Sequence, residues 1–366
     1  MRILTMLLLF SPFFLTSCSS FEQSDKQIKM LQAELAKVET EEFIQKYLIQ
    51  ENGRIQTNFT NRTNNYLSES VGLWMQYLVE RDSFNQFHNQ VEVLRYYFLT
   101  KDNLIAWELN GEEKAAVNAA IDDLRIVDAL FNAGEKWKNP KYTKLAQQIG
   151  ESFVSIQMRN KLMVDYVDLE SKKQSDEVTL SYIIPSGFEH LKSAGLISFD
   201  VYEANRNLLL TAPLSKNGFY PKYYDVQKAT YYYDEEINLI DQLYVGFHLA
   251  QWQGNTDKLM KYLKITFDTN GGKLFGRYDA ETLRPTVNYE AASVYALGIL
   301  FSLERGDKKF AQQLYNRMQV LQQRNKKQEY YGGYIDVYTQ ETHAFDNLLP
   351  LIAERKGLNG AVFKHK

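Results

Sequence analysis

The sequence predicts an all-α protein built from about a dozen helices. Apolar residues recur at helical spacing through most of the 366 residues. The segments between these stretches are short and rich in Gly, Asn, Asp and Lys, as expected of helix connections. Only 7 residues are Pro, and no Pro-rich linker divides the chain. These features favour one large helical domain over two separate domains.

The first residues have the pattern of an export signal. A positive start, Met1-Arg2, precedes an apolar run over residues 3–15 that is too short for a permanent membrane span. Small residues then lead into Cys18, the only cysteine. This arrangement resembles the lipobox of bacterial lipoproteins, in which the cysteine becomes the lipidated first residue. The alternative is an ordinary secretory signal followed by a buried cysteine.

If the chain is a lipoprotein, it divides into three parts. We expect a signal peptide over residues 1–17, then the lipidated Cys18 with a tether and helix over residues 18–40, and one folded domain over residues 41–366. Acyl-chain burial would anchor the protein at the bacterial cell surface, on the outer face of the cytoplasmic membrane. The sequence contains neither GxGxxG nor a Walker-type GK[ST] motif, and we expect no cofactor.

Helical periodicity predicts the elements of the domain in order. The first lies on the stripe of Phe43, Tyr47 and Leu48. Further helices are predicted over residues 66–79, 84–98, 115–133, 140–157, 199–210, 235–253, 256–267, 289–303, 308–323 and 342–353. Residues 160–185 break the pattern, because two alternating segments flank a polar turn at residues 171–176. This interruption predicts a small inserted β-hairpin.

Helices of similar length can form an α/α toroid, a solenoid or an irregular bundle. No motif recurs at a fixed period, which argues against a solenoid. The formal net charge of −3 provides no basic surface for nucleic acid. Aromatic residues make up 14% of the chain, and such a surface suits uncharged, hydroxyl-rich ligands.

Among the residue types that could support catalysis, the carboxylates are the best candidates. The single cysteine and five dispersed histidines form no HExxH motif, so we expect no metal site. No GxSxG elbow for a serine hydrolase is present. Glycoside cleavage requires only two carboxyl groups, one that protonates the leaving oxygen and one that activates water.

Three stretches of the chain resemble glycoside hydrolase family 8. The first is Leu67-Ser68-Glu69-Ser70-Val71-Gly72-Leu73-Trp74-Met75, which is similar to the family's Ser-Glu-Gly-x-Gly-Tyr-x-Met segment. Glu69 falls on the general acid of that segment. Ser70 and Leu73 depart from the pattern, whereas Gly72 and Met75 keep it.

The second stretch, residues 123–137, follows the family signature D-x-x-[IM]-A-x-[SA]-[LIVM]-[LIVMG]-x-A-x3-W in nearly all defined positions. Val127 and Phe131 are the departures. The family usually has an acidic pair just upstream, and its first Asp is displaced here. The resemblance therefore implies that Asp122 or Asp123 holds a sugar hydroxyl, with the choice left open.

The third stretch, residues 232–238, is similar to the family's Tyr-Asp-Ala-x-Arg segment, whose Asp is the general base. The Tyr-Asp pair favours Asp234 as the base, whereas the spacing to the arginine favours Glu235. Asn238 stands where the family has that arginine.

The resemblance implies an (α/α)6 barrel and an inverting, endo-acting glycosidase. The departures put the chain in a divergent branch that resembles the surface lipoproteins accompanying bacterial exopolysaccharide synthesis systems, which implies cleavage of an exopolysaccharide during its synthesis, release or remodelling in a biofilm. The two carboxyl groups would lie about 6.5–9.5 Å apart. Candidate sugar-contacting residues are Asp122, Asp123, Tyr66, Trp74, Trp107, Tyr232, Tyr233 and Asn238.

The expected partners are the polysaccharide and, through Cys18, the membrane, with exopolysaccharide synthase machinery as a further candidate and the protein itself a monomer. Each carboxylate also has a purely structural explanation, such as capping an acidic helix start. The main alternative is a non-catalytic polysaccharide-binding lipoprotein, which the departures at Asn238 and Asp122 favour.

Overall fold

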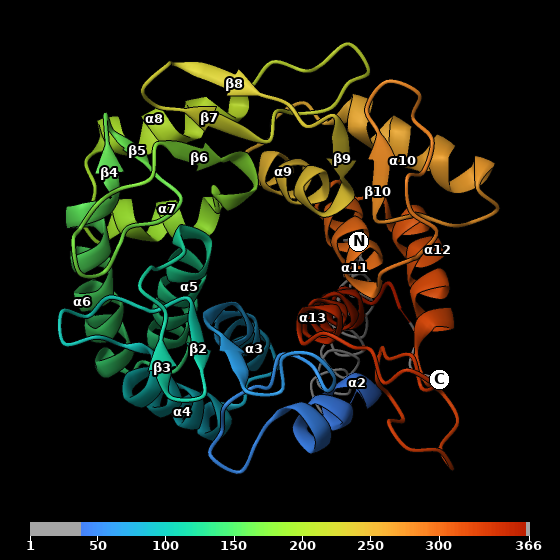
Figure 1. The fold of residues 1–366 in the computed structure, drawn as a ribbon, viewed down its shortest axis with the longest axis horizontal. Helices are drawn as coiled ribbons and strands as arrows, with labels where there is room; N and C mark the ends of the chain where they lie inside the picture. The colour runs from blue at the N-terminus through green and yellow to red at the C-terminus, as the bar shows by residue number, and fades with distance from the viewer. Residues whose placement is uncertain (1–37, 364–366) are drawn as a thin grey trace, which may run out of the picture.

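The computed structural model describes residues 38–363 and shows a closed double ring of helices (Figure 1). The inner ring consists of α3 Ser68–Glu80, α5 Ala120–Lys136, α7 Pro185–Ser193, α9 Leu239–Gln251, α11 Ala292–Glu304 and α13 Phe345–Asn359. The outer ring consists of α2 Glu39–Phe43, α4 Phe84–Val93, α6 Pro140–Gln157, α8 Phe199–Leu210, α10 Asp257–Thr269 and α12 Lys308–Met318. The chain alternates between the rings, which confirms the (α/α)6 barrel.

Neighbouring inner helices close the ring. Helix α3 packs between α5 and α13, and α11 packs between α9 and α13. Residues 292–302 of α11 are all buried, as expected for a helix enclosed by neighbours on all sides. At Gly72, a Cβ atom would lie 3.0 Å from the Arg125 side chain, so glycine permits the close approach of α3 to α5.

Short irregular helices extend several elements. π-Helical turns follow α2 at η1 Ile44–Leu48 and α4 at η2 Leu94–Phe98, and 3-10 turns occur at η3 Leu180–Tyr182 and η4 Gln319–Leu321. Several α-helices begin at side chains that satisfy free backbone N–H groups. Asn139 accepts a hydrogen bond from the Lys141 amide and precedes Pro140 at the first helical position. Ser198 accepts from the Val201 amide in the same way.

Four small antiparallel sheets lie in the connections between helices. They comprise β1 Asn65–Leu67 with β2 Glu108–Asn110 and β3 Glu113–Lys114, β4 Met158–Arg159 with β5 Leu162–Met163, β6 Glu177–Thr179 with β7 Tyr223–Asp225 and β8 Thr230–Tyr232, and β9 Glu236–Asn238 with β10 Arg277–Asp279. Strand β1 runs directly into α3, and β9 runs directly into α9. These sheets therefore frame the end of the ring at which those inner helices begin.

Most predicted helices are confirmed, although several begin later than predicted. Helix α7 was not predicted from the sequence. Residues 115–119 are not helical, because α5 begins at Ala120. Residues 236–238 form β9 rather than the start of a helix. In the predicted hairpin, a single bridge joins Val167 to Gln174 within the polar turn. The strands on either side of this turn, β5 and β6, pair with β4 and β7 respectively rather than with each other.

The predicted signal peptide and Cys18 lie outside the described residues. Between residues 38 and 363, no helix combines the length and apolar character needed to cross a bilayer.

Candidate active site

Glu69 lies in the first turn of α3 and is partly exposed at the framed end of the ring. Burial by the surrounding protein and the negative charge of Asp122 raise the pKa of Glu69 to about 8, although Arg125 opposes this shift. Asp346, in the first turn of α13, raises that pKa further. Glu69 is therefore protonated at neutral pH, which is the state that a general acid requires.

Asp122 links the first turns of α3 and α5. Its carboxylate accepts hydrogen bonds from Ser68 Oγ at 2.8 Å and from Arg125 Nη1 at 2.8 Å. Burial raises the pKa of Asp122, while the Arg125 charge and the Ser68 hydrogen bond lower it. The hydroxyl of Tyr244 on α9 lies 3.5 Å from Arg125 Nη2. Ser68, the chain neighbour of Glu69, is thus hydrogen-bonded directly to Asp122.

Asp123 belongs to a different environment. Its carboxylate accepts from Asn118 Nδ2, and the same amide group donates to Gln157 at the end of α6. Asn118 also accepts from the Val167 amide at 2.7 Å. Asp123 is 1% exposed, and burial raises its pKa well above the ordinary value. The contacts of Asp123 therefore tie the start of α5 to α6, whereas those of Asp122 lie beside Glu69.

A second group of acidic side chains surrounds Tyr182, just before α7. Burial and the negative charges of Asp165, Asp122, Asp241 and Glu69 raise the pKa of Tyr182. The structure thus brings residues from α3, α5 and α9 within electrostatic range of one phenol. No sequence motif marked Asp165, Tyr182 or Asp241, and only the closure of the ring brings them to this place.

Asp241 and Asp165 are both half-buried, and the carboxyl group of each has hydrogen-bond partners. Asp241, in the first turn of α9, accepts from Ser181 Oγ at 3.0 Å. Burial raises its pKa, and the negative charge of Asp234 adds to that shift. Asp165 accepts from both the amide and the hydroxyl of Thr179 at 2.6 Å, and burial raises the pKa of Asp165 to about 7.

Asp234 lies in the connection between β8 and β9, with its side chain 24% exposed. Lys222 Nζ lies 3.5 Å from its carboxylate. Asp234 and Tyr233 line a cavity of about 390 Å³. Glu235 is exposed, and its carbonyl accepts from the Ala280 amide. Asp234 therefore lies beside Lys222 and within electrostatic range of Asp241. Asp241 in turn acts on Tyr182 together with Glu69 and Asp122.

The predicted aromatic contacts separate into buried and accessible groups. Trp74 is 2% exposed and stacks on Tyr77, and Tyr66 is 6% exposed with the Arg54 guanidinium 4.1 Å from its ring centre. Their packing in the core corrects the expectation that they stack on sugar. Tyr233 is 42% exposed, with its hydroxyl bonded to the Pro213 carbonyl.

The remaining candidates have mixed surroundings. Trp107 is half-buried, and its carbonyl accepts from Ser68. Tyr232 is also half-buried and stacks on Tyr223 at 4.9 Å between ring centres. Asn238 caps α9 by accepting from the Ile240 amide at 3.1 Å. The residue in place of the family's arginine therefore has a structural role at the start of an inner helix.

A larger cavity opens at the Glu69 end of the ring. It has a volume of about 770 Å³ and is lined by residues that include Asp346, His343, Glu290 and Tyr338. Asp346 accepts hydrogen bonds from the amide and hydroxyl of Ser293. Asp346 thus lines this cavity and, through its negative charge, also raises the pKa of Glu69. Over residues 38–363, no group of three or more His, Cys, Asp or Glu side chains is arranged to hold a metal ion.

Comparison with known proteins places this geometry in a family. A sequence model described as "Glycosyl hydrolases family 8" matches residues 27–245, more than half of the chain. The chain is 40% identical over 320 residues to the "Putative lipoprotein YdaJ" of Bacillus subtilis (strain 168), which covers 87% of this chain and 86% of that protein.

Two solved structures support the same fold. One, titled a novel alpha-amylase from Clostridium perfringens, superimposes with a TM-score of 0.81 at 26% identity, over 87% of this chain and 96% of that one. Endoglucanase Cel10 from Klebsiella pneumoniae, a family 8 glycosyl hydrolase, superimposes with a TM-score of 0.64 at 14% identity, over 87% and 99%. The protein is therefore a glycoside hydrolase that belongs to glycosyl hydrolase family 8.

Proposed function

We propose that the protein is an endo-acting, inverting glycosidase that is anchored by lipidated Cys18 at the outer face of the cytoplasmic membrane and cleaves a bacterial exopolysaccharide. The observation that carries the proposal is the state of Glu69. This carboxyl group is partly exposed, and its pKa of about 8 keeps it protonated at neutral pH. Asp346, whose negative charge helps to raise that pKa, lines the cavity of about 770 Å³.

In the proposed reaction, Glu69 donates its proton to the glycosidic oxygen as the bond from that oxygen to the anomeric carbon breaks. A water molecule attacks the anomeric carbon from the opposite face and loses its proton to Asp234. Asp122 accepts a hydrogen bond from a hydroxyl of the sugar at the cleavage point. Ser68 and Arg125 hold the Asp122 carboxylate in place for that contact.

Asp234 is the proposed base because Lys222 compensates its negative charge at 3.5 Å and because its side chain is accessible to water. Asp241 is the competing carboxylate, since it lies closer to the cluster around Tyr182. Glu235 remains the alternative from the sequence. Separate substitutions of Asp234, Asp241 and Glu235 by their amides distinguish the three, because only loss of the base abolishes turnover while leaving substrate binding intact.

The substrate assignment rests on the predicted anchor and on the family. The relative named a lipoprotein supports anchoring at the membrane, where an exopolysaccharide would pass during export. One similar structure is titled an alpha-amylase and another an endoglucanase. The substrate panel therefore includes starch and a soluble cellulose beside the polymer that the host itself secretes.

The test measures new reducing ends with each polymer and follows the anomer first formed by NMR. We expect cleavage of the host polymer with inversion, and a loss of at least about 100-fold in Glu69→Gln. Glu304→Gln, an exposed glutamate at the far end of α11, is the matched control. Retained activity in Glu69→Gln would remove Glu69 from the mechanism, and a retained anomer would exclude inversion.

Two outcomes address the other parts of the proposal. A host polymer that binds without being cut would favour the alternative of a polysaccharide-binding lipoprotein. Substitution of Cys18 by Ala should move the protein from the membrane fraction to the soluble fraction. Unchanged membrane association in that variant would overturn the anchor while leaving the reaction untouched.

A further inference from the structure

The connection between α12 and α13 (Figure 1) includes a loop, residues 335–341, that lines the cavity of about 770 Å³. Tyr338, in the middle of this loop, is 94% exposed, the highest fraction among the exposed large apolar side chains of residues 38–363. A second tyrosine, Tyr289, is 51% exposed and lines the same cavity from the segment before α11. Exposed aromatic rings that share one cavity indicate a binding surface.

One buried amide holds both ends of this loop. Asn347, in the first turn of α13, accepts a hydrogen bond from the Tyr334 amide at 2.8 Å, just before the loop begins. Its Nδ2 group donates to Thr342 Oγ1 at 2.9 Å and to the His343 carbonyl at 3.0 Å, just after the loop ends. Thr342 Oγ1 donates in turn to the Tyr334 carbonyl at 2.8 Å. The two ends are therefore fixed to each other and to an inner helix.

The loop is also closed by bonds of its own. The Asp336 carboxylate accepts from the amides of Tyr338 at 2.8 Å and Thr339 at 3.1 Å. The Asp336 amide donates to the Glu341 carbonyl at 3.0 Å. These bonds order the backbone on both sides of Tyr338. An aromatic ring on an ordered backbone loses little conformational entropy when it binds a ligand.

Tyr289 is held in place by a different part of the chain. Its ring packs on Gly276, where a Cβ atom would lie 2.8 Å from the ring. Its hydroxyl is hydrogen-bonded to Arg277 of β10, which also donates to Glu236 of β9 at 3.0 Å. Two separately supported tyrosines thus face one cavity. Flat aromatic faces of this kind suit the C–H faces of sugar rings.

The charged groups on the cavity wall are carboxylates. Among the described residues that line the cavity, four are acidic and none is Lys or Arg. Arg317 compensates one of them, Glu290, through an ion pair. The other three, which give the wall its charge, are Asp336, Glu341 and Asp346. Burial lowers the pKa of His343, so this lining residue is neutral at neutral pH. The wall is therefore negative, and it repels a ligand that carries acidic groups.

We infer that residues 335–341 form a specificity-determining loop, in which Tyr338 stacks on a sugar unit away from the cleavage point while the carboxylates of the wall exclude acidic polysaccharides. The cavity has the volume of a site for about two to three linked sugar units. The inference rests on the proposed function for its ligand, a polysaccharide, but it does not require cleavage.

The test compares polymers that differ only in charge. Affinity electrophoresis at low salt measures their binding to the full chain carrying Glu69→Gln, so that they remain uncut. Hydroxyethylcellulose is paired with carboxymethylcellulose, and starch with carboxymethyl starch, and the polymer that the host secretes is the fifth ligand. We expect the neutral member of at least one pair to bind at least about tenfold more tightly than its carboxymethylated partner.

The role of the ring is tested by substitution of Tyr338. Tyr338→Ala should weaken binding of the neutral polymer by about tenfold, whereas Tyr338→Phe, which keeps the ring, should retain it. Tyr96→Ala is the matched control, because Tyr96 is 78% exposed and lies on η2, outside the cavity lining. For a polymer that the wild-type chain cleaves, Tyr338→Ala should raise KM and leave kcat nearly unchanged.

The role of the charge is tested at Glu341, which is exposed on the loop. Glu341→Gln should reduce the preference for neutral over carboxymethylated polymer by roughly threefold. Glu304→Gln, at the far end of α11, should leave the preference unchanged.

Three results would overturn the inference: equal binding of both members of each pair, undiminished binding by Tyr338→Ala, or no binding of any polymer. Reducing ends released by the wild-type chain test the proposed function separately. Cleavage that is indifferent to Tyr338→Ala would leave the reaction standing without the loop. Binding that depends on Tyr338 without cleavage would support the loop and the alternative of a polysaccharide-binding lipoprotein.

Discussion

Ser68 Oγ donates a hydrogen bond to the Asp122 carboxylate at 2.8 Å, across 54 positions of sequence. Ser68 is the first residue of α3 and the immediate neighbour of Glu69, and Asp122 lies in the first turn of α5. One contact therefore joins the two inner helices that carry the proposed acid and the proposed sugar anchor. Five expected outcomes concern this cluster and the helix ends around it.

The pH dependence of turnover should report Glu69. Because the acid must be protonated, kcat should hold below pH 8 and fall about tenfold per pH unit above it. A falling limb that begins near pH 5 instead would contradict the elevated pKa of Glu69.

Glu69→Gln should also change the pH dependence of stability. The folded-state pKa of about 8 exceeds the ordinary value of 4.5, so the folded protein binds more protons between these limits. Wild-type stability therefore loses the Glu69 contribution as pH rises from 4.5 to 8. The melting temperature of Glu69→Gln relative to wild type should increase over this range, as measured by calorimetry. A difference in melting temperature that does not change with pH would show that Glu69 has the same pKa in the folded and unfolded states.

Asp122→Asn should lower activity by about 100-fold, because it removes the proposed contact to the sugar. It also removes a negative charge that raises the Glu69 pKa, so the falling limb of the pH profile should move to lower pH. Asp123→Asn is the matched neighbour and should leave that limb in place. The reverse pattern would make Asp123 the functional residue.

Arg125→Met should destabilise the protein by about 3–5 kcal/mol, because it leaves the Asp122 carboxyl group buried without its cationic partner. Urea unfolding measures this loss. The double variant Asp122→Asn/Arg125→Met should recover part of it, since neither charge is then left alone. Simple additivity of the two substitutions would show that the pair does not interact.

Asn238→Ala should cost about 1 kcal/mol of stability through loss of the cap of α9. Asn238→Ser should retain most of that stability, because its hydroxyl can accept the same backbone hydrogen bond. A large fall in kcat/KM for Asn238→Ser, with stability retained, would instead indicate a contact between Asn238 and the substrate.

The elements that the sequence predicted accurately have strong local signals. Helices α6 and α8 begin and end at the predicted residues, and each begins after a side chain that caps it, Asn139 and Ser198 respectively. Helix α7 was missed because it has only nine residues and contains Gly187. Its stability comes from tertiary packing, since Gly187 allows it to lie against Leu124 of α5.

The errors in the sequence-based predictions arise from contacts between residues far apart in the chain. Glu235 and Glu236 have the composition of an acidic helix start, but residues 236–238 pair with β10, about 41 residues further along the chain. Motif resemblance singled out Glu69 and the pair Asp122 and Asp123, and the structure places these side chains in the first turns of α3 and α5. It did not identify Asp165, Tyr182 or Asp241, because their proximity arises only when the ring closes.

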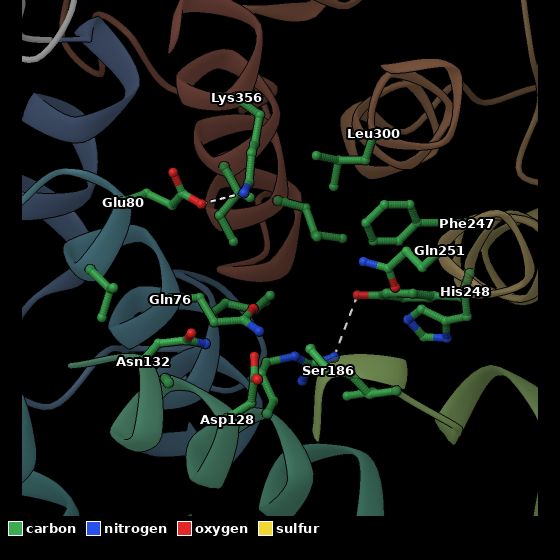
Figure 2. Close-up of a pocket in the computed structure, with 18 residues that line it drawn as sticks. Gln76, Glu80, Asp128, Asn132, Ser186, Phe247, His248, Gln251, Leu300 and Lys356 are labelled. Atoms are coloured by element: carbon green, nitrogen blue, oxygen red, sulfur yellow. Dashed lines mark hydrogen bonds and ion pairs between the residues drawn. The ribbon is translucent and has the colours of Figure 1, made fainter. Parts of the chain in front are cut away.

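Arg125 faces two parts of the interior of the ring: its guanidinium binds Asp122 next to the proposed acid, and its side chain lines a chamber of about 320 Å³ whose walls Figure 2 shows. A displacement of this one cation would alter the proton affinity of Glu69 and the shape of the distant chamber together. Thermodynamic reciprocity then requires that any influence of a chamber occupant on the affinity for polysaccharide be matched by an equal influence in the opposite direction.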